Sequence, residues 1–356
     1  MAEKIFVQGN EAVGWGAVSA GCLYFFGYPI TPQNEITEWF ARELPQRGGI
    51  FVQSESEGAS INMLYGAAAV GVRAMTSTAS PGWGLMQEGM SHLAMAELPC
   101  VVVLVQRGGP GQGTTRHGQT DYLSVTRCGA AGGYKNIVLA PASVQEICEL
   151  VQLAFYLADK YRNPVVVLSD GLLGQAAESL EVRTLDFGPL PEKDWALLGS
   201  ANRKSQAAQF IMSSALPSYV DRLKKLDDKY RQMTESELRY KTYLLDDARL
   251  VLVSYGYTAR VSREAMHMAR SEGLKVGMIR PITLWPFPYR AIREKALQGC
   301  KFLVVEDSLG QLVDDVSTAT EGQAEVHLVG VTARHDPGDG GMIFPERVFE
   351  EIRKLL

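Results

Sequence analysis

The chain has 356 residues, of which 46% are hydrophobic and 21% are charged, and its net charge is −5. This length allows roughly two or three domains with a sizeable core. The acidic balance disfavours nucleic acid or an anionic membrane as the main partner, since both select basic surfaces. The sequence shows neither a secretion signal nor an apolar run long enough to span a bilayer, so we expect a cytoplasmic protein.

The cysteines and histidines show no metal-binding spacing. Five cysteines are scattered without any C-x-x-C pair, and we expect buried free thiols. The pattern therefore predicts neither a zinc site nor an iron–sulfur cluster within this chain, and we expect no metal ligands here. The cysteines are Cys22, Cys100, Cys128, Cys148 and Cys300.

The first half alternates apolar strand-like runs with helical runs rich in small residues. This alternation is typical of a parallel sheet with helices on both faces. The run 100–106 is so continuously apolar that we expect a central strand, buried on both faces. In chain order we expect a helix over 10–26, strands over 50–53 and 73–77, a helix over 84–96, strands over 100–106 and 137–140, a helix over 144–161 and a strand over 165–169.

The composition changes between residues 184 and 247, where charged residues dominate. We interpret this stretch as a linker with an exposed helix whose alternating charges form a solvated face. The α/β alternation then resumes, which predicts three parts: a first domain over 1–185, the linker over 186–247 and a smaller α/β domain over 248–356.

Two further segments of the last part stand out. The proline-rich segment 280–288, RPITLWPFP, is rigid and apolar, and we expect it to pack at an interface. The glycine-rich acidic turn at 336–341 is expected to be a surface loop.

Polar residues follow the ends of the predicted strands, where open α/β sheets bind their ligands. The run from Ser54 to Glu57 follows one strand and opens a helix of small residues, 58–71. Capping alone explains most such clusters. The small residues instead favour close approach of a ligand or another backbone, which makes Glu57 our candidate centre.

Two other strand ends carry candidate binding residues. Thr31 lies between Pro29 and Pro32 in a turn that two prolines make rigid, and it either caps the next helix or faces a ligand. Arg107 leaves the most apolar strand and enters the loop 108–113, which is rich in glycine. A guanidinium in that position suits a carboxylate or a phosphate. The loop lacks the Gly-Lys-Ser/Thr of a Walker A motif, so nucleotide binding is disfavoured.

Four segments together resemble the alpha subunit of 2-oxoacid:ferredoxin oxidoreductases: GYPITPQNEI at 27–36, QSESEGASINMLYGAAAVG at 53–71, MTSTASPG at 75–82 and RGGPGQG at 107–113. The resemblance extends over nearly the whole chain. It implies a thiamine-diphosphate-binding fold of the pyrimidine type, followed by a smaller domain like the C-terminal domain of transketolase. The similarity is greatest to subunits assigned to 3-methyl-2-oxobutanoate and to 2-oxoglutarate.

The resemblance assigns site residues by position. Counting back from Gly66, Glu57 falls where the family's glutamate pairs with the aminopyrimidine of thiamine diphosphate, and Glu55 is its neighbour and a possible cap. Thr31 and Arg107 fall where the family binds its substrate. Arg116 departs from the expected pattern, and our hypothesis is that it pairs with a second carboxylate, which would favour 2-oxoglutarate. The implied cofactor-binding residues are Pro29, Ile30, Thr31, Glu57, Ser80, Pro81 and Gly82.

The resemblance also implies partners. Family members carry out coenzyme A-dependent oxidative decarboxylation and pass the electrons to ferredoxin. The magnesium motif Gly-Asp-Gly is missing here, because the sequence at 169–171 reads Ser-Asp-Gly, so a beta subunit is expected to supply the diphosphate and Mg²⁺ site. Iron–sulfur clusters are expected on other chains only, with gamma and ferredoxin-like delta subunits in the complex. Two alternatives stay open: a non-oxidative thiamine-dependent transferase or decarboxylase, and a non-catalytic α/β protein that binds small molecules.

Overall fold

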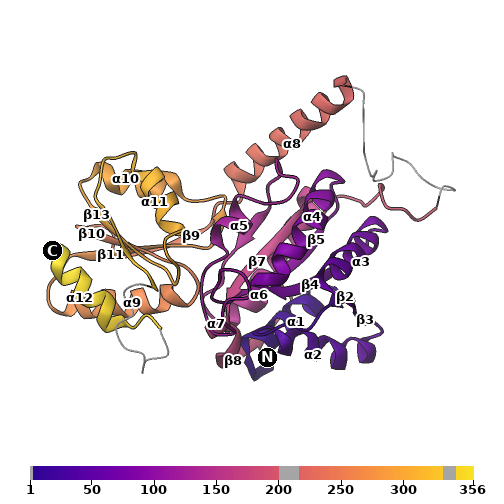
Figure 1. Cartoon of the computed structure of the whole chain (residues 1–356), viewed down its shortest axis with the longest axis horizontal. Helices are drawn as coiled ribbons and strands as arrows, with labels where there is room; N and C mark the ends of the chain where they lie inside the picture. Colours follow the sequence, from indigo (N-terminus) through magenta and orange to yellow (C-terminus); the bar gives the residue numbers. More distant parts are fainter. Residues whose placement is uncertain (1–2, 200–215, 332–341) are drawn as a thin grey trace.

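The computed structural model describes residues 3–199, 216–331 and 342–356. Two α/β domains lie side by side, the first in indigo to magenta and the second in orange to yellow (Figure 1). The acidic turn predicted at 336–341 lies outside the described residues.

The first domain is built on a seven-stranded sheet with the order β12-β6-β7-β5-β4-β2-β3. All neighbours pair in parallel except β12, which runs antiparallel to β6. The strands are β2 (Tyr24–Gly27), β3 (Ile50–Gln53), β4 (Ala74–Ala79), β5 (Cys100–Gln106), β6 (Ile137–Leu139), β7 (Pro164–Asp170) and β12 (Thr283–Trp285).

Helices cover both faces of this sheet, as predicted. One face packs against α1, α2 and α6, and the other against α3 and α4. The helices and the one 3₁₀ turn of this domain are α1 (Gly9–Ser19), α2 (Asn34–Glu43), η1 (Pro45–Arg47), α3 (Glu57–Ala69), α4 (Ser80–Met95), α5 (Tyr122–Thr126), α6 (Val144–Tyr161) and α7 (Gly171–Gln175). A two-stranded antiparallel sheet, which sequence reasoning missed, joins β1 (Glu3–Gln8) to β8 (Ala177–Val182).

Strand β5 confirms the prediction made from its composition. All seven of its residues are buried, and it lies between β4 and β7 near the middle of the sheet. Continuous burial of Val and Leu on both faces is what a central parallel strand requires.

The helix predicted over 10–26 is wrong in its second half. Helix α1 ends at Ser19, and Gly21 turns the chain with a φ of +75°, a conformation that favours glycine. Residues Tyr24–Gly27 then form β2, because pairing with β3 and β4 places Phe25 in the core, stacked on Phe40 at 4.2 Å. In the sequence, the small residues of α1 run directly into the aromatic residues of β2. No change of pattern marks the end of the helix, which is why the predicted helix was too long.

The helix predicted to begin at Gly84 begins at Ser80 instead. Pro81 lies in its first turn, where a missing backbone N–H costs nothing and the fixed φ suits a helix. Residues 80–83, which precede the predicted helix, therefore form the N-terminal turn of α4.

The second domain is a five-stranded sheet with the order β14-β13-β10-β11-β9, in which only β9 is antiparallel. Helices α9 and α12 pack on one face, and α10 and α11 on the other. Its elements are β9 (Tyr240–Tyr243), β10 (Leu250–Val253), α9 (Gly256–Ser271), β11 (Val276–Pro281), α10 (Tyr289–Leu297), β13 (Lys301–Val305), α11 (Leu312–Thr320), β14 (Val326–Val329) and α12 (Pro345–Leu355).

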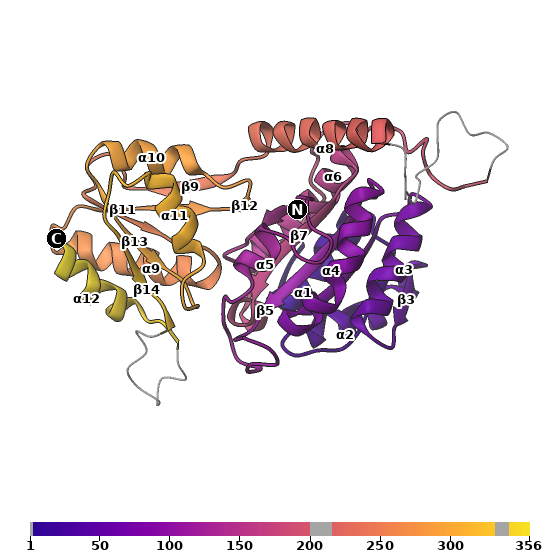
Figure 2. The same ribbon diagram turned by 45° about the horizontal axis from the view of Figure 1, so that its top comes forward.

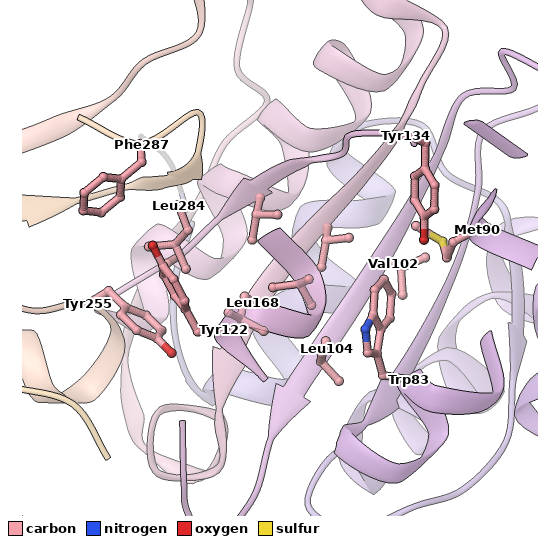
Figure 3. Close-up of a cluster of buried hydrophobic side chains, with 14 of the residues drawn as sticks. Trp83, Met90, Val102, Leu104, Tyr122, Tyr134, Leu168, Tyr255, Leu284 and Phe287 are labelled. Carbon is pink, nitrogen blue, oxygen red and sulfur yellow. The ribbon is translucent and has the colours of Figure 1, made fainter. Parts of the chain in front are cut away.

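A continuous apolar core joins the two domains. The segment 280–288 packs at this interface, as predicted: it contains β12, which extends the sheet of the first domain, and it buries Leu284 and Phe287. Figure 3 shows Leu284 and Tyr255 beside Tyr122 of the first domain, and the two tyrosine rings lie 5.7 Å apart.

The charged stretch forms helix α8 (Leu216–Ser236), which lies along the top of the first domain (Figure 2). The prediction of a simply solvated face is wrong for part of it. Lys225 and Lys229 bind the two oxygens of Glu97, at 2.5 and 3.0 Å; the Lys229 side chain is 9% exposed and Met233 is completely buried. Two basic side chains of α8 therefore pair with an acidic residue of the first domain.

Candidate active site

The candidate residues lie at one edge of the seven-stranded sheet. Strands β2, β3, β4 and β5 are mutually parallel neighbours, so their carboxyl ends meet at that edge. Thr31 follows β2, Glu57 follows β3, Ser80 follows β4 and Arg107 follows β5. The structure therefore brings together side chains that are up to 76 residues apart in sequence.

The first turn of α3 separates the two glutamates. Ser56 caps the helix, and its hydroxyl accepts a hydrogen bond from the N–H of Ala59 at 3.2 Å. The capping role considered for Glu55 is therefore wrong, because the shorter serine side chain fills that position and Glu55 is exposed. Glu57 is 5% exposed and points toward the sheet edge, against α4.

The carboxylate of Glu57 lies against Gly82. A Cβ atom on Gly82 would be 2.5 Å from Glu57 Oε1 and 2.1 Å from Thr78 Oγ1, so only glycine fits here. Within the described parts of the chain, no side chain or backbone group donates a hydrogen bond or forms an ion pair with this carboxylate. Neither oxygen is fully enclosed, so the carboxylate can still accept a hydrogen bond from a group bound at the sheet edge.

Thr31 is exposed at the tip of the turn after β2. The N-cap position of the helix that follows is Gln33, which makes no side-chain capping hydrogen bond, so the interpretation of Thr31 as the cap is wrong. The buried Gln33 fixes the turn from behind, because its amide donates to Tyr28 O at 3.1 Å and accepts from Ser77 Oγ at 2.5 Å. Pro29 is exposed and Ile30 is half-buried in the same turn.

Arg107 is 6% exposed, and its guanidinium spans the turn and the glycine-rich loop. Nη1 donates to Thr31 O at 2.8 Å, and Nη2 donates to Gln112 O and Oε1 at 2.9 and 3.2 Å. Ser80 supports the same residue, since its Oγ accepts from the Arg107 backbone N–H at 3.0 Å. Thr31, Ser80 and Arg107 are thus joined by direct hydrogen bonds.

Asp121 is a site residue that sequence reasoning missed. Its carboxylate pairs with the hydroxyl of Ser80, and burial raises the pKa of Asp121 to about 6, against the lowering effects of that hydrogen bond and of the Arg107 charge. Asp121 and Ser80 line a cleft of about 480 Å³ between the glycine-rich loop and residues 307–311 of the second domain. The only sequence signal was a polar residue soon after that loop.

Arg116 follows the glycine-rich loop, and two backbone hydrogen bonds tie it to that loop. Its N–H donates to Thr114 Oγ1 at 3.2 Å, and its carbonyl accepts from Gly108 N–H at 3.3 Å. The residue is exposed.

Asp170, the aspartate of the Ser-Asp-Gly segment at 169–171, has a structural role. It is completely buried and caps α7, with Oδ1 accepting from Leu173 N–H and Oδ2 from Tyr257 N–H, each at 2.9 Å. Across residues 3–199, 216–331 and 342–356, no group of three His, Cys, Asp or Glu side chains could hold a metal ion. No helix in these ranges is long and apolar enough to cross a membrane.

Comparison with known proteins identifies the family of the chain. Residues 15–236 match the family described as "Pyruvate flavodoxin/ferredoxin oxidoreductase, thiamine diP-bdg", and residues 248–347 match "Pyruvate:ferredoxin oxidoreductase core domain II". The ketoisovalerate oxidoreductase subunit VorB of Methanothermobacter thermautotrophicus is 47% identical, over 98% of this chain and 97% of its own. The 2-oxoglutarate synthase subunit KorA of Methanothermobacter marburgensis is 38% identical, over 99% of each chain.

Solved structures show the same architecture. The 2-oxoglutarate:ferredoxin oxidoreductase from Magnetococcus marinus, solved with 2-oxoglutarate, coenzyme A and succinyl-CoA bound, matches with a TM-score of 0.87 at 29% identity. The match covers 99% of this chain and 65% of that longer chain. A split-gene transketolase, solved as an inactive beta4 tetramer, matches with a TM-score of 0.60 at 15% identity, which shows a shared fold alone.

Fold and site thus define an α/β protein of the thiamine-diphosphate-binding class. The chain belongs to the 2-oxoacid:ferredoxin oxidoreductases, as an alpha-type subunit. This membership confirms the predicted fold class and the predicted oxidoreductase function. It decides against both alternatives left open by the sequence, the non-oxidative thiamine enzyme and the non-catalytic binding protein.

The raised pKa of Asp121 predicts a specific pH dependence of stability. Its pKa of about 6 in the folded chain exceeds the ordinary value of 3.8, so the folded state binds the proton more tightly. Stability from this group is fully present below about pH 4 and is lost as the pH rises through 6, on the order of 2–3 kcal/mol. Asp121→Asn, which stays neutral, should remove this loss.

Urea unfolding of both proteins at pH 5 and pH 7.5 checks this prediction. The difference in unfolding free energy between variant and wild type should shift in favour of the variant at the higher pH. The same difference at both pH values would show that Asp121 does not carry the burial cost assigned to it.

Proposed function

We propose that this chain supplies the pyrimidine half of a thiamine diphosphate site, in a complex that oxidatively decarboxylates a 2-oxoacid with coenzyme A and passes the electrons to ferredoxin. The single observation that carries the proposal is Glu57, a buried carboxylate without a hydrogen-bond donor, pressed against Gly82 at the ligand edge of the sheet. A ring nitrogen that shares a proton with Glu57 would supply the missing partner.

Each residue of the edge has a proposed task. When bound, thiamine diphosphate supplies a nucleophilic carbon for attack on a 2-oxo group. Glu57 holds a proton at the aminopyrimidine nitrogen, and Gly82 lets the ring approach that carboxylate closely. Thr31, through its exposed hydroxyl, and Arg107, through its planar guanidinium, bind the 2-oxo group and carboxylate of the substrate. The other residues proposed to line the cofactor are Pro29, Ile30, Ser80 and Pro81.

We propose that a beta subunit completes the site with its diphosphate and Mg²⁺ motif. The outer faces of α3 and α4 support this, because Met63 and Leu85 are 40% and 60% exposed there. Gly66 and Gly84 on the same helices have open space where a Cβ would lie, so a partner backbone could approach them. Apolar side chains among small residues are typical of a surface that another chain covers.

Further subunits carry the electrons in this proposal. Gamma and ferredoxin-like delta subunits hold the iron–sulfur clusters and bring coenzyme A and ferredoxin to the complex. We place the complex in the cytoplasm, where the five cysteines would stay reduced; all five are free thiols in this structure.

For the substrate we propose 3-methyl-2-oxobutanoate first and 2-oxoglutarate second. The relative named for ketoisovalerate is 47% identical to this chain, whereas the relative named for 2-oxoglutarate is 38% identical. Purification of the native complex, followed by ferredoxin reduction assays with both acids, tests this order. Absence of any partner chain and of any 2-oxoacid-dependent reduction would refute the proposed function.

Glu57→Gln in the assembled complex should leave thiamine diphosphate and substrate bound. It should slow the exchange of the cofactor's C2 proton by on the order of 10²-fold or more, because an amide cannot share the proton with the ring nitrogen. Proton NMR of the exchange into deuterium oxide measures this rate. Glu55→Gln is the matched control, since Glu55 is exposed two residues away, and it should exchange at the wild-type rate. Unchanged exchange in Glu57→Gln would remove Glu57 from this role.

Arg116 is the residue that we propose to bind a second carboxylate when the substrate is 2-oxoglutarate. Arg116→Ala should then raise the KM for 2-oxoglutarate about tenfold, as expected for one lost charge-assisted hydrogen bond, and leave the KM for 3-methyl-2-oxobutanoate unchanged. Steady-state assays on both acids decide the matter. If the variant kept its kinetics on both, Arg116 would have no part in binding.

A further inference from the structure

The positively charged guanidinium of Arg107 donates its hydrogen bonds to neutral oxygens only. Its guanidinium is almost completely buried, yet the three oxygens that accept its hydrogen bonds are all neutral: Thr31 O, Gln112 O and Gln112 Oε1. Its Nε is buried and has no hydrogen-bond partner among the described residues. Asp121 lies nearby, but its carboxylate hydrogen-bonds to Ser80 rather than to the guanidinium. A buried cation held by amide oxygens alone retains a strong preference for a carboxylate.

The partners of Arg107 also differ in how firmly they are held. Thr31 O belongs to the turn that the buried Gln33 fixes against β4. Gln112 is exposed and lies between Gly111 and Gly113, whose φ angles of +64° and +54° place both in the left-handed region. Because Gln112 is exposed, its side chain can leave the guanidinium without unpacking any core residue, which makes that side chain the exchangeable partner.

The carboxamide of Gln112 resembles the group that Arg107 is proposed to bind. An amide oxygen and a carboxylate oxygen both accept from a guanidinium N–H in the same plane, but the charged acceptor binds about twice as strongly. Gln112 Oε1 receives such a bond from Nη2 at 3.2 Å, at the upper end of the usual range. A substrate carboxylate would make the same contact at shorter range.

We propose that Gln112 is a positioning residue that occupies Arg107 in place of the substrate, and that the carboxylate of the 2-oxoacid displaces its side chain on binding. This inference rests on the proposed function, since it takes Arg107 as the site of the substrate carboxylate. Gln112 keeps the guanidinium in its binding geometry while the site is empty. The cost is a lower apparent affinity, because only the fraction of molecules with a released Arg107 can bind.

Two substitutions separate this role from direct contact with the substrate. Gln112→Glu places a competing carboxylate on Arg107 and should raise the KM for the 2-oxoacid by about tenfold or more. Gln112→Ala removes the side-chain competitor and should lower that KM by about two- to fivefold, the size of one neutral hydrogen bond. The kcat at saturating substrate should stay near the wild-type value for both, since the side chain of residue 112 no longer contacts the Arg107 guanidinium once substrate is bound.

The experiment uses the assembled complex with saturating coenzyme A and measures ferredoxin reduction against 2-oxoacid concentration. Thr115→Glu is the matched control, because it adds a carboxylate to an exposed position of the same loop and should leave KM unchanged. Calorimetric titration with the corresponding 2-hydroxyacid, which keeps the carboxylate but is not decarboxylated, gives the dissociation constant without turnover. It should follow the KM values in both directions.

Opposite shifts for Gln112→Glu and Gln112→Ala support the inference. Shifts in the same direction, or changes in kcat with KM constant, would overturn it, because they describe a residue that contacts the substrate or shapes the loop. A wild-type complex that reduces no ferredoxin with any 2-oxoacid would overturn the proposed function instead. In that case the analogue titration still tests whether Gln112 competes for Arg107.

Discussion

One buried amide, the side chain of Gln106 at the end of β5, holds together the parts on which the site depends. Its Nε2 donates to Ser169 O of β7 at 3.2 Å, and its Oε1 accepts from Asp121 N–H and from the hydroxyl of Tyr255, at 3.2 and 3.3 Å. Gln106 is completely buried, so a partner lost here would leave a polar group without a hydrogen bond. Because Arg107 follows directly, this amide fixes where the guanidinium emerges.

Buried hydrogen bonds of this kind also hold the two domains together. Tyr255 belongs to the second domain, and the buried Gln119 links the domains again, since its amide donates to Tyr255 O at 3.0 Å and its backbone N–H donates to Asp307 O at 2.7 Å. The cleft beside Asp121 therefore has one wall from each domain. At the cleft beside Asp121, the second domain covers the edge of the first sheet. Over α3 and α4, whose small residues lie outward, nothing in this chain covers that edge among the described residues. A site closed on one side only is consistent with completion by another subunit.

The sequence predicted the elements whose pattern is local. Strand β5 and helix α6 were located residue for residue, because a continuous apolar run and a helical period each have one simple interpretation. The family resemblance, counted back from Gly66, distinguished Glu57 from Glu55, and the structure buries the first and exposes the second. Tertiary pairing decided the rest: β2 was mistaken for helix, and β12 is a strand only because β6 lies beside it. The contacts of Asp121 and Gln112 depend on loop geometry, which no periodicity encodes.

The central claim is that this chain holds half of a cofactor site. Isothermal titration of thiamine diphosphate with Mg²⁺, first into the purified chain and then into the chain reconstituted with its beta subunit, tests it most directly. The account predicts no measurable binding to the chain alone and stoichiometric binding to the reconstituted pair, weakened by substitution of Gly82 with alanine, whose Cβ would collide with Glu57. Tight, magnesium-dependent binding to the chain alone would contradict it.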